Sequence, residues 1–367
     1  MTSVTDRLPR VRCHLQAMPL GNRKAADYAQ IAGEERIARL HEAAQPLGGL
    51  RVLHLAAAGS RLRSPELVPS LLSLYEDLGL QAEFQTLTGD RPLWRLTKQL
   101  EDGLQGGETA ITDESWAEYL EDSPTPENFD VVIAHGPAPL AASAKAGTAY
   151  VFRCELGHAN ADDRLKPLID GAAATTDDEA IDPLAPGLID LDVRLAGSML
   201  RSLGVDLAQP AIFQARPFDT WQDPHAVIDA FTDAAVPGLQ LVLAGDPQND
   251  DPEAWRLLRE LTDYADSSDG LLVLRNVGDV ELNALRTLAR VGIHSPLARG
   301  SELATFETLW KRTPVAGADP NRIVELITDP GLAIEEGEAG HERVKHSRLI
   351  TSLAENELRL LASFQSA

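Results

Sequence analysis

The sequence predicts an α/β protein made of two doubly wound, Rossmann-like domains that face each other across a cleft. Three observations predict this fold class. The chain has 367 residues, which is long for one average domain and suits two. Short apolar segments alternate with amphipathic ones in both halves, as in βαβ units with parallel strands. A stretch with Pro183, Pro186 and Gly187 separates the two series near the midpoint.

The first half contains an alternating series of strands and helices. Strands are predicted at 51–55, 82–87, 130–134 and 149–153, and helices at 64–78, 93–104 and 113–120. Ser64-Pro65 provides an N-cap and a first helical position. Apolar residues at 93, 96, 100 and 104 recur at helical spacing, which indicates an amphipathic helix.

The second half repeats the alternation. Strands are predicted at 211–214, 239–244, 271–274 and 291–294, and helices at 224–234, 252–265, 280–289 and 303–310. The tail from 342 to 364 is predicted to be helical. The predicted domains are therefore 1–187 and 188–345, followed by a C-terminal helix at 346–367 that packs back toward the first domain. Ligands of such sheets bind at the carboxyl ends of the strands, which predicts a site in the cleft.

The charge balance narrows the class of partner. The chain has 33 basic and 56 acidic residues, a net charge of −23. Such a surface repels nucleic acid and anionic membranes, so neither is expected as a partner. Few of the basic residues are lysines. An acidic, lysine-poor surface is typical of a halophilic protein in a salty cytoplasm, but an acidic proteome from a GC-rich genome explains it equally well.

The cysteines and the N-terminus predict the compartment. Cys13 and Cys154 are too few for a disulfide framework or a metal site. No cofactor is expected either. The first 18 residues lack the apolar core of a signal peptide. No apolar run approaches the ~18 residues needed to span a bilayer. A cytoplasmic protein is the expectation.

Nine segments carry a family resemblance. They are RVLHL (51–55), DVVIAH (130–135), FRC (152–154), AIDPL (180–184), FDTWQDP (218–224), GLQLVLAG (238–245), DDPE (250–253), VGDVELNAL (277–285) and ETLWKRTPV (307–315). In this order they resemble the trehalose synthases of glycosyltransferase family 4. The resemblance implies a GT-B fold with an acceptor-side first domain and a nucleotide-side second domain. It also implies retaining transfer of glucose from a nucleoside diphosphate donor to glucose, no metal, and a dimer.

The donor diphosphate of such an enzyme needs cations and backbone N–H groups, because charge grows on it as the leaving group departs. The family supplies an Arg and a Lys at the start of the second domain. Without gaps, Pro217 stands at the arginine position and Gln222 at the lysine position, while Arg216 lies one residue early. A one-residue shift in an extended segment turns a side chain to the opposite face.

Two further family features are altered in the first domain. A glycine-rich loop is replaced by residues 59–64, GSRLRS, in which the β-carbons of Leu62 and Arg63 would crowd a phosphate. Where the family has an Asp after the His of its His-Asp-Pro motif, this chain has Gly136 after His135. Where the family has a His after its Trp-Arg-Cys, this chain has Glu155.

The family's pair of glutamates, eight residues apart, is half kept. Glu307 stands at the second position, to which the resemblance gives the ribose contact, whereas Arg299 stands at the first. A guanidinium cannot accept the sugar hydroxyl bonds that a carboxylate accepts. The candidates for catalysis are therefore His135, Arg153 and Glu155. The candidates for nucleotide or substrate binding are the following residues: Glu307, Arg216, Arg299, Arg63 and Asn283.

Each candidate also has a structural interpretation. His135 and Arg153 end buried strands, where a hydrogen-bonded histidine and a salt bridge are common. Glu307 lies early in a predicted helix, where a carboxylate favours the dipole. Asn283 is typical of turn and helix-start chemistry.

The arginines at 61, 63, 216 and 299 have a joint interpretation. They would form an anion site if all four faced the cleft, and otherwise they are solvated surface residues.

Three hypotheses follow. The first is a glycosyltransferase homologue that has lost catalysis and serves as a binding, regulatory or assembly partner, as a homodimer or paired with a related glycosyltransferase. The alternative is an active retaining enzyme for trehalose synthesis with a rebuilt donor site. The third is a sensor of another anionic ligand. The departures fall where ligand chemistry belongs while the scaffold segments are kept, which favours the first hypothesis.

Overall fold

The computed structural model describes residues 13–215, 218, 220–247, 251–297 and 300–365. The chain divides into two compact units. Unit 1 comprises Met1–Glu179, Arg299–Ser301 and Thr351–Ala367, and unit 2 comprises Ala180–Ala298 and Glu302–Ile350. The C-terminal segment is therefore grouped with the N-terminal residues. The predicted domain limits at 187 and 345 stay predictions.

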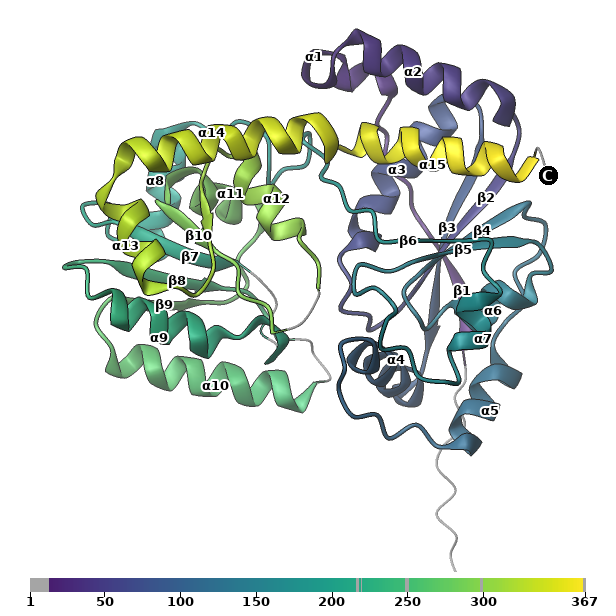
Figure 1. Cartoon of the computed structure of the whole chain (residues 1–367), viewed down its shortest axis with the longest axis horizontal. Helices are drawn as coiled ribbons and strands as arrows, with labels where there is room; N and C mark the ends of the chain where they lie inside the picture. The colour runs from purple at the N-terminus through teal and green to yellow at the C-terminus, as the bar shows by residue number, and fades with distance from the viewer. Residues whose placement is uncertain (1–12, 216–217, 219, 248–250, 298–299, 366–367) are drawn as a thin grey trace, which may run out of the picture. The chain divides into compact units, whose positions relative to one another are not determined.

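Unit 1 contains a six-stranded sheet with the order β1-β3-β2-β4-β5-β6 (Figure 1). The strands are β1 (Cys13–Met18), β2 (Arg51–Ala57), β3 (Gln81–Gly89), β4 (Val131–His135), β5 (Ala149–Arg153) and β6 (Ala174–Thr176). From β2 the chain adds β3 on one side and then β4 to β6 on the other, all parallel. This doubly wound order confirms the predicted fold class. The edge strand β1, antiparallel to β3, was not predicted.

The helices of unit 1 cover both faces of its sheet. They are α1 (Ala29–Ala32), α2 (Glu34–Ala44), α3 (Val68–Asp77), α4 (Arg91–Leu104), α5 (Asp113–Asp122), α6 (Leu140–Lys145), α7 (Lys166–Asp170) and α15 (Ile350–Gln365). Short 3₁₀ turns are η1 (Ala25–Tyr28), η2 (Gln45–Leu47) and η3 (Ser64–Leu67). The apolar stripe of α4 is buried as predicted, in a core shared with α5, α6 and α7. Helices α3 and α15 lie on the other face (Figure 1).

Unit 2 contains a five-stranded parallel sheet with the order β11-β10-β7-β8-β9. The strands are β7 (Ala211–Ala215), β8 (Gln240–Ala244), β9 (Leu271–Leu274), β10 (Val291–Ile293) and β11 (Val315–Ala316). Strands β7 and β8 are buried along their whole length, which explains their continuous apolar sequence.

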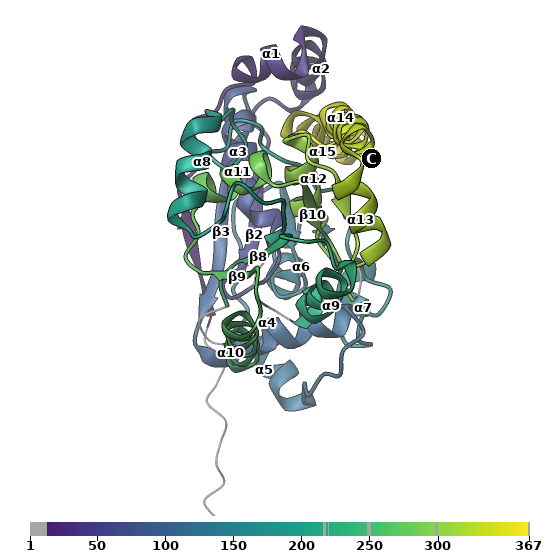
Figure 2. The same cartoon turned by 90° about the vertical axis from the view of Figure 1, so that its left-hand side faces the viewer.

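The helices of unit 2 form two layers around this sheet. They are α8 (Val193–Ser202), α9 (Pro224–Ala234), α10 (Pro252–Ser267), α11 (Asp279–Leu288), α12 (Leu303–Trp310), α13 (Pro320–Thr328) and α14 (Pro330–Ser347), with the turn η4 (Thr220–Gln222). One core joins α8 and α11 to the sheet, and another joins α9, α10 and α13. Figure 2 shows α8 and α11 on one side and α9 and α13 on the other.

The predicted helical tail is broken in two. Helix α14 ends at Ser347 and α15 begins at Ile350. Between them the carbonyl of Arg348 accepts the N–H of Ile181, and the carbonyl of Ile181 accepts the N–H of Ile350, both at 2.8 Å. This exchange interrupts the helical hydrogen bonds and forms a short parallel bridge. Among the described residues, no helix combines the length and apolar character that crossing a membrane requires.

Candidate functional site

The loop after β2 directs its backbone donors at a carboxylate of the same unit. The N–H groups of Arg63 and Ser64 donate to the two carboxylate oxygens of Glu155, each at 2.8 Å. Glu155 lies two residues beyond the end of β5, so the strand end holds the carboxylate against the first turn of η3. Such a contact satisfies N–H groups that a helical turn leaves unpaired. These two donors are therefore already bound.

Glu155 is buried beside a second carboxyl group. The pKa of Glu155 is raised to about 7, because burial disfavours its charge and Glu179 repels it, while the two N–H donors and Arg63 act in the opposite direction. Glu179 in turn accepts a hydrogen bond from the hydroxyl of Ser301. Above neutral pH the Glu155 carboxylate is charged; its bonds to the two N–H groups are then stronger, but burial and the repulsion of Glu179 make the charged form the less favourable one in the fold.

The same loop is filled from within by Leu62. The Leu62 side chain is buried in the apolar core beneath α4 and lies against Gly136, the first residue after β4. Gly136 has a φ of +83°, a conformation that glycine adopts most readily. The two altered positions, in the loop and after β4, are therefore in direct contact.

Two predicted anion-site arginines are bound by carboxylates of unit 1. Arg61 donates to Glu101 at 3.3 Å and to Asp102 at 2.5 Å, and its side chain is nearly buried. Arg63 pairs with Glu66 at 3.0 Å. Arg216, Pro217 and Arg299 lie outside the described residues, so the joint anion site stays a prediction.

His135 and Arg153 end neighbouring strands and face α15. Arg153 forms a buried ion pair with Glu357 of this helix. His54 Nδ1 lies 2.9 Å from His135 Nε2, and its Nε2 lies 3.0 Å from Glu357 Oε1. The hydroxyl of Tyr75 donates to Glu357 at 2.6 Å. All the contacts of His135 and Arg153 given above lie inside this network. The interpretation of the two residues as a hydrogen-bonded histidine and a salt bridge at buried strand ends therefore explains these contacts.

Burial sets the protonation of this network. The pKa of His135 is held well below its usual range, first by burial and then by His54 and Arg153. The pKa of His54 is also lowered, mainly by burial. Burial alone would raise the pKa of Glu357, but Arg153, His54 and Tyr75 outweigh it and lower the pKa. At neutral pH the histidines are therefore neutral and the carboxylate is charged.

In unit 2, Glu307 occupies the fifth position of α12 and is buried. Its carboxylate accepts a hydrogen bond from the Arg286 guanidinium at 2.5 Å. Arg286 also donates to the carbonyl of Gly187 at 3.4 Å. The ion pair, rather than the helix dipole considered from the sequence, accounts for the burial of this carboxylate.

Asn283 fixes the segment that leads into unit 2. Its fully buried amide donates to the carbonyl of Pro186 at 3.0 Å and to that of Ile189 at 2.9 Å. Lys311 donates to the same Ile189 carbonyl at 2.9 Å. The side-chain N–H groups of Asn283 thus bind backbone of a distant segment from the fifth position of α11, which is not the turn or helix-start role that the sequence suggested.

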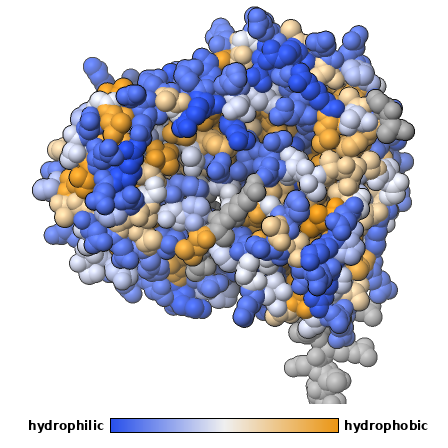
Figure 3. Space-filling view, in the orientation of Figure 1, coloured by the Kyte–Doolittle hydropathy of each residue, from blue (hydrophilic) through white to orange (hydrophobic). Residues whose placement is uncertain are grey.

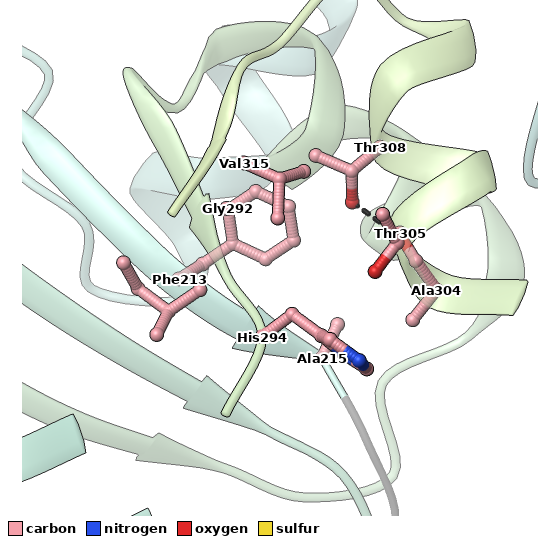
Figure 4. A pocket seen from close by; sticks show the side chains of 9 residues that line it. Phe213, Ala215, Gly292, His294, Ala304, Thr305, Thr308 and Val315 are labelled. Atoms are coloured by element: carbon pink, nitrogen blue, oxygen red, sulfur yellow. Dashed lines mark hydrogen bonds between the residues drawn. The ribbon is translucent and has the colours of Figure 1, made fainter. Parts of the chain in front are cut away.

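A small hollow lies between α12 and the strands β7 and β10 (Figure 4). It is lined mainly by Phe213, Ala215, His294, Thr305 and Thr308, and has a volume of about 10 Å³. Gly292 permits the close approach of α12, since a β-carbon there would lie 2.7 Å from Thr308 Cγ2. A volume of about 10–15 Å³ admits one water molecule. This hollow is too small for a glucosyl group.

Comparison with known proteins shows which family the chain resembles. Residues 65–181 match the family model described as "Trehalose synthase, N-terminal domain". The trehalose synthase of Rubrobacter xylanophilus is 29% identical over 95% of this chain and 99% of that protein. The trehalose synthase of Pyrococcus horikoshii is 27% identical over 94% and 97%. The chain is therefore similar to trehalose synthases along nearly its whole length.

Solved structures agree on the fold of this trehalose synthase-like protein. An α,α-trehalose 6-phosphate synthase from Burkholderia multivorans superposes with a TM-score of 0.62 at 13% identity, over 87% of this chain and 98% of that one. A sucrose-phosphate synthase from Thermosynechococcus elongatus superposes with a TM-score of 0.60 at 14% identity, over 86% and 99%. The GT-B architecture predicted from the sequence is confirmed.

The trehalose synthase-like chain also uses residues that the sequence did not single out. Glu101, Glu357 and Arg286 are buried charged residues, and each binds a side chain that had been a candidate or lies beside one. One signal was available for Glu357, which stands on the apolar side of the helix at 350–365. A charged residue on such a stripe indicates a buried partner.

Proposed function

We propose that this trehalose synthase-like protein has lost glucosyl transfer and serves as a binding, regulatory or assembly partner. One observation carries the proposal: the backbone N–H groups of Arg63 and Ser64 are bound by Glu155. A metal-free transferase needs free donors of this kind for the donor diphosphate. Here an internal carboxylate occupies them.

The loss in donor affinity that follows from the two occupied N–H groups can be estimated. Each charge-assisted hydrogen bond contributes about 1.5–3 kcal/mol. Losing two costs about 3–6 kcal/mol, or roughly 10²–10⁴ in donor affinity. Because the same groups stabilise the transition state, the rate falls as well. A protein with this deficit at one loop, and with Pro217 and Gln222 in place of two cations, has little hold on a nucleotide-sugar.

Charge at α12 supports the same proposal. The exposed residue at its N-cap is Glu302, which makes no side-chain capping bond. The N-terminus of a helix attracts anions, and a carboxylate placed there opposes a second anion. In unit 1 the guanidinium of Arg61 is likewise taken by Glu101 and Asp102. Both changes reduce the attraction for a diphosphate.

The partner in this proposal is a protein of the same kind. A chain that no longer binds a sugar nucleotide can still form a homodimer, or a heterodimer with an active relative. With a net charge of −23, nucleic acid and anionic membranes are excluded from the proposal, and we place the protein in the cytoplasm.

The second candidate is an active retaining glycosyltransferase that moves glucose from a nucleoside diphosphate-glucose to a sugar acceptor. The favouring observation is Glu307, which keeps the family's carboxylate at its family position. In this case Glu307 has to exchange Arg286 for a ribose.

Titration calorimetry with UDP-glucose and ADP-glucose at millimolar concentration separates the two candidates. The trehalose synthase of Rubrobacter xylanophilus serves as the positive control. We expect no binding heat from this chain and no disaccharide after incubation with glucose. Tight donor binding together with disaccharide formation would remove the proposal in favour of the second candidate.

A further inference from the structure

The buried network around Glu357 joins the C-terminal helix α15 to the middle of the unit 1 sheet. Glu357 is the member that belongs to α15. The titratable and charged side chains that meet it are, by element, His54 of β2, His135 of β4, Arg153 of β5 and Tyr75 of α3. All five are buried. Because β2, β4 and β5 are neighbours inside the sheet, α15 is the element of this set that can leave without breaking any strand pairing.

Glu357 stands in the middle of an aliphatic stripe on α15. Leu353, Ala354, Leu358 and Leu361 recur around it at helical spacing and are buried with it. On the face of unit 1 that carries α15, Figure 3 shows hydrophilic residues interspersed with hydrophobic ones. An aliphatic residue at 357 would hold the helix equally at every pH. A buried carboxylate instead makes the attachment depend on the charges of the groups that it meets.

The distances in the network fix the hydrogen positions on both histidines. A carboxylate only accepts hydrogen bonds, so the hydrogen of His54 lies on Nε2, which is 3.0 Å from Glu357 Oε1. Nδ1 of the neutral His54 ring is then an acceptor, and His135 Nε2, 2.9 Å away, donates to it. His135 Nδ1 is buried and has no hydrogen-bond partner among the residues that the structure describes. The donors therefore run one way, from His135 through His54 to Glu357.

This arrangement excludes a further proton while α15 is in place. The free ring nitrogen is His135 Nδ1, and His135 is paired with Arg153 in the register of β4 and β5, so both side chains lie on the same face of the sheet. Arg153 already balances the charge of Glu357, and an added proton leaves the buried cluster with a net positive charge. The lowered pKa values of both histidines agree with this, since burial outweighs the attraction of Glu357 for His54.

A second set of charges holds α15 without a histidine. Glu355 of α15 pairs with Arg36 and Arg39 of α2 and with Arg359 one turn further along α15. An arginine is already protonated and cannot take up another proton. These pairs therefore attach α15 to unit 1 independently of the charge on His54 and His135, and they provide a control for it.

We propose that proton uptake by His54 and His135 in mild acid detaches α15 from unit 1, so that the C-terminal helix is a pH-sensitive element of the fold. Once α15 has left, water reaches both rings, and each binds a proton with an ordinary pKa of about 6.5. The attachment is strongest above pH ~6.5 and weakens as the pH falls below it. Between pH 7.5 and 5.5 the detached fraction should rise by up to about 10-fold for each histidine, or about 100-fold for both.

Hydrogen exchange of the full chain measures the detachment. It is read by mass spectrometry and corrected for the intrinsic effect of pH on exchange. We expect peptides from 350–365 to lose up to ~100-fold in protection at pH 5.5 relative to pH 7.5, while peptides from β2 and β4 keep theirs. Unchanged protection of α15 would overturn the proposal. A loss that is equal in α15, β2 and β4 would also overturn it, because it would indicate unfolding of the whole unit.

Three variants test the assignment to the histidines. His135→Gln keeps a donor for His54 but cannot be charged, so the response to pH should fall to about 10-fold. His41→Gln is the matched control, because His41 is exposed in the last turn of α2, and it should keep the full response. Glu355→Gln should raise detachment at both pH values and leave their ratio unchanged.

Equal responses of the His135 and His41 variants would also overturn the proposal. The wild-type comparison at two pH values needs no variant, so it decides the matter even if His135→Gln does not fold. Since no sugar nucleotide is involved, failure here leaves the proposed function standing.

Discussion

The side chain of Leu62 and a side chain at residue 136 exclude each other. A β-carbon at Gly136 would lie 2.4 Å from Leu62 Cδ1, well inside van der Waals contact. The trehalose synthase resemblance implies glycine in the loop and aspartate after β4, whereas this chain has Leu62 in the loop and Gly136 after β4. The two departures are therefore coupled in this chain, because the Leu62 side chain occupies the space that a side chain at residue 136 would need.

Replacing Gly136 by aspartate should therefore unfold the protein more easily. We expect Gly136→Asp to lower the free energy of unfolding by about 1–3 kcal/mol, because Leu62 must move and because a β-carbon at positive φ is strained. Adding Leu62→Ala should return part of that loss. Urea unfolding of both single variants and the double variant gives the interaction energy.

Gly147→Asp is the control for backbone strain alone. Gly147 has a φ of +70°, and nothing lies within 4 Å of a β-carbon built there. It should cost less than Gly136→Asp. Strictly additive effects of Leu62→Ala and Gly136→Asp would show that the two positions do not act on each other.

The buried ion pair of Arg153 and Glu357 should contribute a large part of the free energy that holds α15 in unit 1. Glu357→Gln leaves the Arg153 charge buried without its counter-ion, so we expect a loss of about 3–5 kcal/mol in unfolding free energy. Replacing both residues by methionine should recover much of it. Chemical denaturation measures all three proteins.

An exposed pair provides the comparison for Glu357. Glu325 pairs with Arg322 at 2.5 Å, and its side chain is 54% exposed. Glu325→Gln should cost at most about 1 kcal/mol, since water screens this pair. If Glu357→Gln costs no more than this control, the pair with Arg153 does not hold α15.

Glu155 should make stability fall as pH rises toward neutrality. Its folded-state pKa of about 7 lies above its ordinary value of 4.5, so the folded chain binds more protons between these values. The contribution is present below pH ~4.5 and is lost as pH rises through ~7. A pKa difference of about 2.5 corresponds to roughly 3 kcal/mol.

Unfolding of Glu155→Gln and wild type at pH 5 and pH 8 tests this sign. The variant should lose less stability between the two pH values than the wild type. Buried His54 and His135 act in the opposite direction, since their lowered pKa values destabilise the fold in acid, but they do so equally in both proteins. Glu66→Gln, an exposed control in the same loop region, should keep the wild-type profile. Parallel profiles for all three proteins would contradict the assignment.

Local sequence patterns predicted the elements that are themselves locally determined. The strand at 149–153, the helix at 224–234 and the helix at 303–310 have the predicted bounds, because apolar spacing and an N-terminal proline define them. The strand at 13–18 was missed because it is mostly exposed and gains its pattern from pairing with β3. The break at 348–349 was missed because Ile181, far away in sequence, causes it.

The sequence predicted which residues of the candidate site matter, but not which residues they contact. The sequence identified Leu62, Gly136 and Glu155 as departures from the family. It did not show that Glu155 reaches the loop 92 residues earlier, or that Arg153 meets a carboxylate 204 residues later. Contacts of this range depend on the whole fold, and no local period encodes them. The same limit applies to the contact between Arg286 and Glu307.

Glu307 should behave as a structural residue when it is replaced. Its carboxylate pairs with a guanidinium that is only 4% exposed, so Glu307→Gln leaves a buried charge without its counter-ion. We expect a loss of about 2–4 kcal/mol in unfolding free energy, against less than about 0.5 kcal/mol for the exposed Glu335→Gln on α14. A carboxylate kept for a ligand is usually a cost to stability, and its removal is neutral or stabilising. Urea unfolding of the two variants therefore separates the candidate functions: a stable Glu307→Gln protein would indicate that this carboxylate is kept for a sugar nucleotide.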